Sequence, residues 1–288
     1  MKRREFIKTT ALGVGAAWLG SKALPTVALP ATGKFSATDI VTIGRTGIKT
    51  SRLACGTGTI GYDHHSNQSA LGIAGLSDLL CRGYDNGLRF FDTADSYGTH
   101  PHVGAALKRV PREKVTILTK SWARNGDQMR KDLDRFRKEL NTDYFDILLM
   151  HCLQESDWNT QFRSAMDAIA EAQEKGIVHA HGCSCHTIEA LRVAAKEPWV
   201  QVMLSRVNPI GSNMDADPET VVSTLWEARA AGKGIIGMKI LGQGDMRNRQ
   251  DEALKYALSL NLLDAFTIGA ENANEQADLI RRIAAVGA

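Results

Sequence analysis

From about residue 38 onward, short apolar runs alternate with longer segments in which apolar residues recur every three or four positions. The short runs have the length of buried strands, and the longer segments have the period of amphipathic helices. Strands are therefore predicted at residues 53–55, 88–92, 115–120, 145–151, 178–183, 200–207, 235–241 and 265–268. Helices are predicted between them, among others at residues 129–140, 162–174, 187–196, 219–231, 251–260 and 275–285.

Eight such units predict an α/β fold, a closed (β/α)8 TIM barrel that covers residues 38–288. A β-hairpin precedes the units, with strands at Ile40–Ile43 and Ile48–Thr50 around a glycine-containing turn. An open doubly wound sheet is the alternative, but no Gly-x-Gly-x-x-Gly motif opens a helix after the first strand. The barrel also predicts where a site would lie, at the carboxyl ends of its strands.

Composition supports one large domain and argues against two kinds of partner. The 288 residues are 43% hydrophobic and 23% charged, which is ample for a buried core. A net charge of +3, without a basic run along a helix face, does not indicate a nucleic-acid partner. No stretch of about eighteen apolar residues occurs, so a membrane-spanning helix is not expected.

Residues 1–31 have the features of a targeting segment that is removed. The paired Arg3 and Arg4 precede a moderately apolar stretch that ends in small residues and prolines, with cleavage expected near Ala28 or Ala31. This order resembles a twin-arginine export signal, and a basic tail without fixed structure is the alternative. The resemblance implies export of the folded protein to the periplasm by the twin-arginine machinery, with no membrane span left after processing.

The five cysteines leave the redox environment open, because their number is odd and no Cys-x-x-Cys pair occurs. Cys183 and Cys185 point to one face of a strand but lie too far apart along an extended chain for an easy disulfide. A metal site built from Cys152, Cys183, Cys185 and His186 is conceivable, but ordinary small residues at a barrel mouth are the preferred interpretation. No metal is expected.

Four polar residues lie at or just beyond the ends of three successive strand-like runs: Asp92, Tyr97, Lys120 and His151. If these runs are neighbouring parallel strands about 4.8 Å apart, their carboxyl ends can bring the four side chains together. A carboxylate, a phenol, an ammonium and an imidazole form a proton-transfer site. The alternative is a structural Asp–Lys pair with an incidental tyrosine and histidine.

The residues around these four resemble the signature of the aldo-keto reductases. The matching phrases are Phe91–Gly98 (FDTADSYG), Lys120 in ILTK and His151 in LLMH, and the resemblance runs from about Ile40 to Ala285. It implies a nicotinamide-dependent enzyme that interconverts a carbonyl compound and an alcohol. The hairpin resembles the plug that this family places under its barrel.

Each of the four residues has a role that its chemistry suits. Tyr97 can give a proton to a carbonyl oxygen or withdraw one from an alcohol if its pKa falls below about 10. Lys120 favours the phenolate, and Asp92 holds the ammonium because a buried cation without a partner is costly. His151 orients the substrate oxygen or relays a proton.

The cofactor is inferred from the resemblance, because none of the four residues carries a hydride. The positions that match the family's nucleotide contacts are Gly56, Thr59, Ser184, Cys185, Met238, Lys239, Leu241, Gly242, Gly244 and Glu271. Glycines in the loop 241–244 would let backbone amides approach phosphate oxygens, and a plain turn is the alternative.

Several of these positions depart from the family pattern. Cys185, Leu204 and Met238 stand where an asparagine, a glutamine and an aromatic residue usually contact the nicotinamide. Lys239 is either a phosphate or substrate contact or a solvated residue at a strand end. Near the last strand, Ala270, Glu271 and Gln276 replace the residues that bind a 2′-phosphate, which favours NAD over NADP because a carboxylate repels phosphate.

The sequence does not identify the substrate. His64, His65, Trp122 and Trp158 are expected in loops around the pocket, and an open pocket could admit a sugar or another polar carbonyl compound. A second function class is a non-catalytic nucleotide-binding barrel that acts as a redox-sensing or scaffold subunit. The complete set of Asp92, Tyr97, Lys120 and His151 favours catalysis, because a scaffold does not need a tuned phenol.

Overall fold

The structure, a computed structural model, describes residues 35–286. The segment interpreted as an export signal, residues 1–31, lies outside the described residues.

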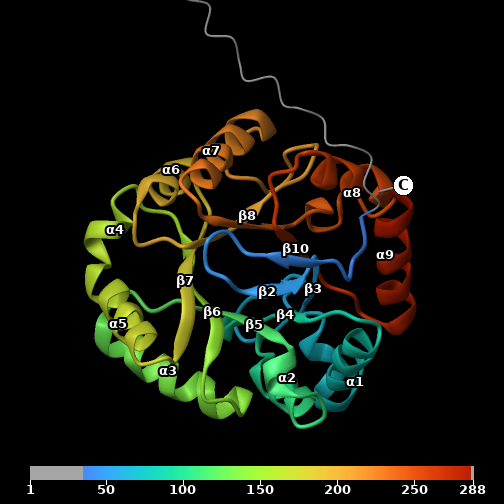
Figure 1. Cartoon of the computed structure of the whole chain (residues 1–288), viewed down its shortest axis with the longest axis horizontal. Coiled ribbons are helices and arrows are strands. Elements are labelled where there is room, and N and C mark those ends of the chain that lie inside the picture. Colours follow the sequence, from blue (N-terminus) through green and yellow to red (C-terminus); the bar gives the residue numbers. More distant parts are fainter. Residues whose placement is uncertain (1–34, 287–288) are drawn as a thin grey trace, which may run out of the picture. The chain divides into compact units, whose positions relative to one another are not determined.

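Eight parallel strands close into a barrel in the order β10-β3-β4-β5-β6-β7-β8-β9 (Figure 1). Every neighbouring pair is parallel, and each pair except β10 with β3 joins strands that are consecutive in the chain. The strands are β3 (Leu53–Gly56), β4 (Phe90–Asp92), β5 (Thr116–Ser121), β6 (Phe145–Leu153), β7 (Val178–Cys185), β8 (Val202–Arg206), β9 (Gly234–Met238) and β10 (Ala265–Ile268). The predicted TIM barrel is confirmed.

The helices form a ring outside the strands (Figure 1). They are α1 (Gly72–Asp85), α2 (His100–Leu107), α3 (Gly126–Leu140), α4 (Trp158–Gln161), α5 (Arg163–Glu174), α6 (Ile188–Lys196), α7 (Pro218–Ala230), α8 (Gln250–Ser259) and α9 (Ala273–Val286). Polar side chains start several of them: Asn125, Thr187 and Asp217 each accept a hydrogen bond from the backbone three residues later. Four 3-10 turns complete the described part, η1 (Ser69–Leu71), η2 (Asp95–Tyr97), η3 (Arg112–Lys114) and η4 (Gly242–Gly244).

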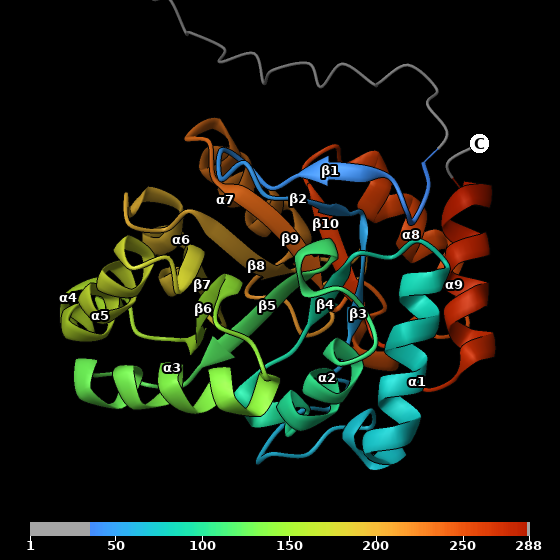
Figure 2. The same ribbon diagram turned by 60° about the horizontal axis from the view of Figure 1, so that its bottom comes forward.

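The N-terminal hairpin closes the amino-terminal end of the barrel, as predicted. Its strands β1 (Ile40–Thr42) and β2 (Lys49–Ser51) pair antiparallel, and Figure 2 shows the hairpin at one end of the barrel. Ile43 is fully buried among the side chains inside the barrel. The amide of Gly44 donates to Asp264 Oδ2 at 3.0 Å, which ties the turn to the residue before β10.

Two separate apolar clusters reflect the alternation of side chains along the strands. One fills the barrel and contains Phe90, Leu118, Leu149, Leu204 and Ile236. The other lies between the strands and the helices and is larger. A residue two positions after an interior residue also points inward, so this pattern decides which polar residues reach the barrel mouth.

Several strand ends differ from the prediction, and two of these differences bear on the site. The strand β9 ends at Met238 rather than Leu241, because Lys239 adopts a left-handed conformation with φ 52° that leaves the sheet. The strand β7 continues to Cys185, so Ser184 lies within the sheet and not beyond it.

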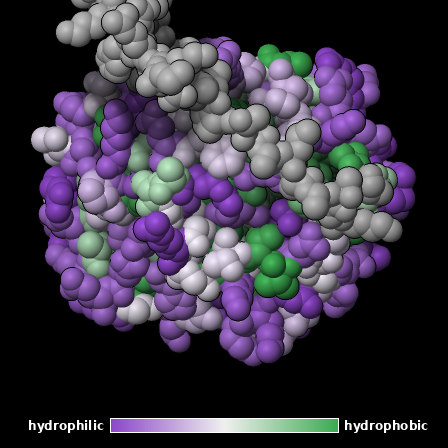
Figure 3. Space-filling view, turned by 45° about the horizontal axis from the view of Figure 1, so that its top comes forward, coloured by the Kyte–Doolittle hydropathy of each residue, from purple (hydrophilic) through white to green (hydrophobic). Residues whose placement is uncertain are grey.

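The face shown in Figure 3 is mostly hydrophilic, with hydrophobic side chains in isolated patches. Within residues 35–286, none of the helices is both long and apolar enough to cross a membrane.

Candidate active site

The inward alternation continues into a last layer of residues at the carboxyl ends of the strands. Along its strand, each member follows the residues that belong to the cluster filling the barrel, at a spacing of two or four positions, and so points inward as they do. The layer consists of Gly56, Asp92, Lys120, His151, Ser184, Arg206, Met238 and Thr267, one residue from each strand. Three of the four predicted catalytic residues are therefore neighbours in one layer, and Tyr97 follows β4 in the turn η2.

A buried ion pair forms the base of this site. The Lys120 side chain is fully buried, and its Nζ donates to Asp92 Oδ1 at 2.5 Å and to the Thr93 carbonyl at 2.8 Å. Thr267 donates its hydroxyl to the other carboxylate oxygen of Asp92 at 2.9 Å. Burial lowers the pKa of Lys120, but Asp92 and Tyr97 outweigh it, so the net pKa is raised and the ammonium is retained.

The Tyr97 ring lies over this ammonium. Lys120 Nζ is 4.7 Å from the ring centroid, and Tyr97 is 9% exposed. The β3–α1 loop packs on the ring so closely that a side chain at Gly58 or Gly61 would overlap it: a Cβ there would come within 2.2 or 2.3 Å. The two glycines are thus required by the tyrosine, because any larger residue would displace it.

Burial and charge act in opposite directions on the phenol. Burial raises the pKa of Tyr97 above its usual value, and the Lys120 ammonium opposes that rise. As expected from the sequence, Lys120 lowers the pKa of Tyr97, but burial raises it more, so the net pKa is above its usual value. The sequence pattern indicated the nearby cation but not how deeply the phenol is buried.

His151 is held as a neutral imidazole. Burial, followed by Lys120 and other nearby cations, places the pKa of His151 well below its usual value. Its ring makes an edge contact with Tyr97, with centroids 5.7 Å apart, and lies 5.3 Å from the ring of Trp122. Ser96 Oγ lies 3.5 Å from His151 Nδ1, and Arg124 donates to the His151 carbonyl at 2.7 Å.

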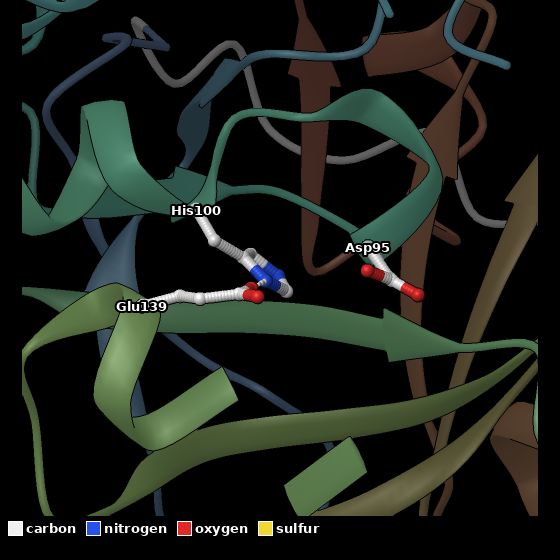
Figure 4. Close-up of side chains that lie close together, drawn as sticks. All are labelled: Asp95, His100 and Glu139. Atoms are coloured by element: carbon white, nitrogen blue, oxygen red, sulfur yellow. Dashed lines mark hydrogen bonds and ion pairs between the residues drawn. The ribbon is translucent and has the colours of Figure 1, made fainter. Parts of the chain in front are cut away.

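A polar network fixes the turn that carries Tyr97. Asp95, His100 and Glu139 lie close together, and Figure 4 shows the His100 ring directed at Glu139. Arg135 binds both oxygens of Asp95, at 2.7 and 2.9 Å, and also Glu139. His100 bridges Glu139 and the hydroxyl of Thr119, at 2.9 and 2.8 Å. Because Arg135 already neutralises the carboxylates, we interpret the group as a structural network that joins η2 and β5 to α3.

The four residues of the alternative metal site form two pairs and do not come together as one group. Within residues 35–286, the group just described is the only one with three metal-ligating side chains in mutual reach. Cys183 and Cys185 have sulfur atoms 3.9 Å apart and are free thiols. Cys152 instead faces His186, with Sγ 2.8 Å from Nδ1.

Several predicted nucleotide contacts line the mouth. Met238 and Ser184 belong to the inward layer, and Ser184 Oγ accepts from the Cys152 amide at 2.9 Å, which leaves its hydroxyl proton free to donate. Gly56 lies so close to the end of β10 that a Cβ would contact Thr267 Oγ1 at 2.8 Å. Gly242 and Gly244 have φ of 58° and 110°, values that suit glycine, in the turn after Leu241.

Other predicted contacts are placed differently. Cys185 is 1% exposed and belongs, with Cys183, to the apolar cluster between the strands and the helices. Side chains alternate along a strand, so Cys185 points toward the helices when Ser184 points into the barrel. Thr59 is engaged by Gln68, whose amide donates to Thr59 Oγ1 at 2.9 Å. Glu271 is exposed and accepts from Asn67 at 2.6 Å, which links the loops after β3 and β10.

Two further expectations near the mouth differ from what the structure shows. Trp158 was expected in a pocket loop, but it is fully buried and donates to the Ala190 carbonyl at 3.3 Å, so that expectation is wrong. Gln276 is buried and donates to the Leu79 carbonyl at 3.1 Å. Of Ala270, Glu271 and Gln276, the three positions aligned with the family's 2′-phosphate contacts, only Glu271 is exposed. Trp122 is 41% exposed beside His151, and His64 and His65 are exposed in the loop after β3.

Sequence reasoning missed Arg206, Thr267 and Arg124. Arg206 and Thr267 belong to the inward layer, and the alternation of β8 and β10 could have indicated them. Arg124 lies in a loop, where no periodicity exists to place it.

The closed barrel, with a buried Asp–Lys pair, a tyrosine and a histidine at its mouth, agrees with the oxidoreductase class that the sequence resemblance implies. Comparison with known proteins agrees, since the model of the Aldo/keto reductase family matches residues 52–284. The chain belongs to this family, which uses NAD(P)H.

The chain is 34% identical over 126 residues to the methylglyoxal reductase DkgB of Salmonella typhi. The match covers 42% of this chain and 45% of that relative, so the alignment spans less than half of its length. A Pseudomonas aeruginosa structure assigned to the aldo-keto reductases is similar with TM-score 0.71, 22% identity and coverage of 87% and 97% of the two chains. A Bombyx mori aldo-keto reductase in complex with NADP gives TM-score 0.64 at 17% identity, covering 87% and 92%.

Proposed function

We propose that this protein interconverts an aldehyde, ketone or sugar carbonyl and the corresponding alcohol with NAD(H) or NADP(H), and that Tyr97 is its general acid and base. The observation that carries the proposal is the position of the Tyr97 ring 4.7 Å from the ammonium of the buried Lys120–Asp92 pair. A phenol held against a fixed cation can release or take up a proton at the same atom.

The four residues would divide the work as follows. Tyr97 donates its proton to the carbonyl oxygen during reduction and accepts the alcohol proton during oxidation. Lys120 stabilises the phenolate, and Asp92 with Thr267 keeps the lysine in place. The neutral imidazole of His151 can donate a hydrogen bond to the substrate oxygen without adding charge to the site.

The residues at the mouth fit a nicotinamide dinucleotide. Ser184 has a free hydroxyl proton for an amide oxygen, and Met238 offers a polarizable surface to a flat ring. The turn at Gly242–Gly244 would hold phosphate oxygens. When bound, the nicotinamide supplies the hydride. NAD is favoured over NADP because Glu271, the exposed one of the three positions aligned with the family's 2′-phosphate contacts, is a carboxylate.

The relatives support a reductase acting on small carbonyl compounds, since one is named a methylglyoxal reductase and another structure contains NADP. The alternative, a nucleotide-binding scaffold, is supported only by the replacement of nicotinamide contacts at Cys185 and Leu204. Arg3 and Arg4 support export by the twin-arginine route to the periplasm.

Replacement of Tyr97 by phenylalanine tests the function. The ring and its packing on Gly58 and Gly61 remain, so the fold and the NADH affinity should be unchanged while reduction falls about 100-fold or more. Turnover of aldehydes, ketones and sugars is followed by nicotinamide absorbance, and NADH binding by fluorescence.

Retention of more than about a tenth of the activity by the phenylalanine variant would remove Tyr97 from the role. Nucleotide binding by the wild type without turnover of any compound would favour the scaffold.

A further inference from the structure

A thiol and an imidazole face each other beside the four predicted catalytic residues. Cys152 directly follows His151 in β6, and His186 is the residue after β7. Cys152 Sγ lies 2.8 Å from His186 Nδ1, and the side-chain amide of Gln154 donates to the same sulfur at 3.6 Å. Neither Cys152 nor His186 has a part in the proposed reaction, so the pair is open to other chemistry.

The partner of its sulfur distinguishes Cys152 from the other cysteines, whereas its exposure does not. All five cysteines lie within the described residues and are free thiols. Cys55, Cys81 and Cys152 are 8%, 7% and 6% exposed, so small molecules reach them about equally. Cys81 Sγ is directed at the Ala106 carbonyl at 4.0 Å, and Cys55 Sγ at the amide of Gln276 at 3.9 Å. Of these three thiols, Cys152 is the one with a nitrogen base in contact.

The backbone at Cys152 is tied to the candidate active site on two sides. Its amide donates to Ser184 Oγ at 2.9 Å. Arg124 donates to the His151 carbonyl at 2.7 Å and to the Cys152 carbonyl at 3.4 Å. A chemical change at the sulfur would therefore be transmitted to His151 and Ser184, which both belong to the inward layer.

The groups around the sulfur suit the reaction of a thiol with a peroxide. Burial raises the pKa of Cys152, so the resting group is a thiol whose proton must leave when the sulfur attacks. Burial, followed by Arg206 and Lys239, lowers the pKa of His186 to about 3. Its imidazole is therefore neutral, and one ring nitrogen can accept the thiol proton. The amide of Gln154 is a hydrogen-bond donor for an oxygen added to the sulfur.

We propose that Cys152 is an oxidation site that reacts with a small peroxide to give a sulfenic acid, with His186 as the proton relay. The sulfur attacks one peroxide oxygen, so that an S–O bond forms and the O–O bond breaks. The thiol proton passes through His186 to the leaving hydroxide, which departs as water. The sulfur is oxidised and the peroxide is reduced, and no further reactant takes part.

Oxidation at this position would act as a reversible switch on the candidate active site. The added oxygen displaces the backbone that carries His151 and bonds to Ser184, the groups proposed to orient the substrate oxygen and the nicotinamide. A small thiol reverses the change, because a sulfenic acid condenses with a thiol to a disulfide that a second thiol reduces. The switch rests on the proposed function, whereas the oxidation of the thiol does not.

The test measures the oxidation of each cysteine directly, without nucleotide or turnover. The wild type and the variants His186→Phe and His179→Phe are treated with hydrogen peroxide, unfolded and alkylated. Mass spectrometry of the peptides then gives the fraction of each thiol that escaped alkylation. Cys81 is the control within each sample, because its exposure matches that of Cys152. His179, another histidine of β7, has a side chain that is 45% exposed and controls for the loss of an imidazole.

In the wild type, Cys152 should be oxidised about tenfold faster than Cys81 or more, because a positioned base assists it. His186→Phe should bring the rate at Cys152 close to that at Cys81, and His179→Phe should leave it unchanged. Equal rates at the two cysteines of the wild type, which no variant needs to show, would overturn the site. So would a rate at Cys152 that is the same with and without His186.

Carbonyl reduction is measured on the same samples. The rate of the wild type should fall in proportion to the oxidised fraction of Cys152 and return with dithiothreitol. Cys152→Ser should keep its own untreated rate in peroxide, which controls for oxidation of methionine. Oxidised Cys152 with undiminished reduction would overturn the switch. If the wild type reduces no carbonyl compound, the proposed function fails, and the alkylation measurement still decides the oxidation site.

Discussion

At the scale of single residues, the character of the site follows from where charge is buried. The ammonium of Lys120 is fully buried and still charged, because Asp92 compensates it and Thr267 and Thr93 satisfy the remaining groups. Tyr97 shares this burial, which raises its pKa, and only the lysine opposes the rise. Among the residues that the structure describes, Lys120 is therefore the one neighbour that lowers the pKa of the phenol.

Replacement of Lys120 by methionine should shift the pH dependence of alcohol oxidation to higher pH. In the proposed mechanism oxidation requires the Tyr97 phenolate. The lysine favours that form, so its loss should raise the pKa of the phenol further. The pH–rate profile is the measurement, and melting temperatures show whether the uncompensated Asp92 destabilises the variant.

The double variant Asp92→Asn with Lys120→Met removes both charges and controls for that destabilisation. It should show a smaller alkaline shift than the single variant, because the Asp92 carboxylate itself raises the pKa of Tyr97. A profile of an active single variant that coincides with that of the wild type would mean that Lys120 does not tune the phenol.

At the scale of elements, the helix α3 holds the turn η2, which carries Tyr97. Arg135 connects α3 to η2 through Asp95, and His100 connects Glu139 of α3 to Thr119, the residue before Lys120. The turn with the tyrosine and the strand with the lysine are therefore fastened to the same helix. Because proton transfer depends on geometry, a shift of the turn should affect the reaction more than nucleotide binding.

Replacement of Arg135 by glutamine should lower kcat about tenfold or more, with NADH affinity unchanged. The matched control is Arg130→Gln on the same helix, whose partners Asp127 and Glu171 are on the surface. Steady-state kinetics and NADH fluorescence are compared for both variants. Equal losses in the two, or a loss of NADH affinity with Arg135→Gln, would indicate only a general effect on the helix.

At the scale of the whole molecule, the barrel and the candidate signal together raise the question of cofactor supply. Residues 1–31 lie outside the described part of the structure, so the export of this protein remains a prediction from Arg3 and Arg4. A protein exported after folding could carry its dinucleotide along, and slow dissociation would keep it bound.

We expect the exported protein to contain NAD(H) and to reduce one substrate with the hydride taken from another, without added nucleotide. Protein purified from the exported fraction should release near-stoichiometric nucleotide on denaturation. Changing Arg3 and Arg4 to lysine should keep the protein in the cytoplasm. Exported protein that lacks nucleotide and depends strictly on added NAD(P)H would contradict the retention of the cofactor.

The sequence by itself determined the barrel, its hairpin plug and the four residues Asp92, Tyr97, Lys120 and His151. These features depend on local periodicity, and a polar residue that ends an apolar run keeps that position whatever packs around it. The tertiary structure decided the net shift at Tyr97, the outward packing of Cys185, the burial of Trp158 and the pairing of Arg206 with Asp215. Such outcomes depend on strand register, on the side to which each residue points and on contacts between distant segments, which no local pattern contains.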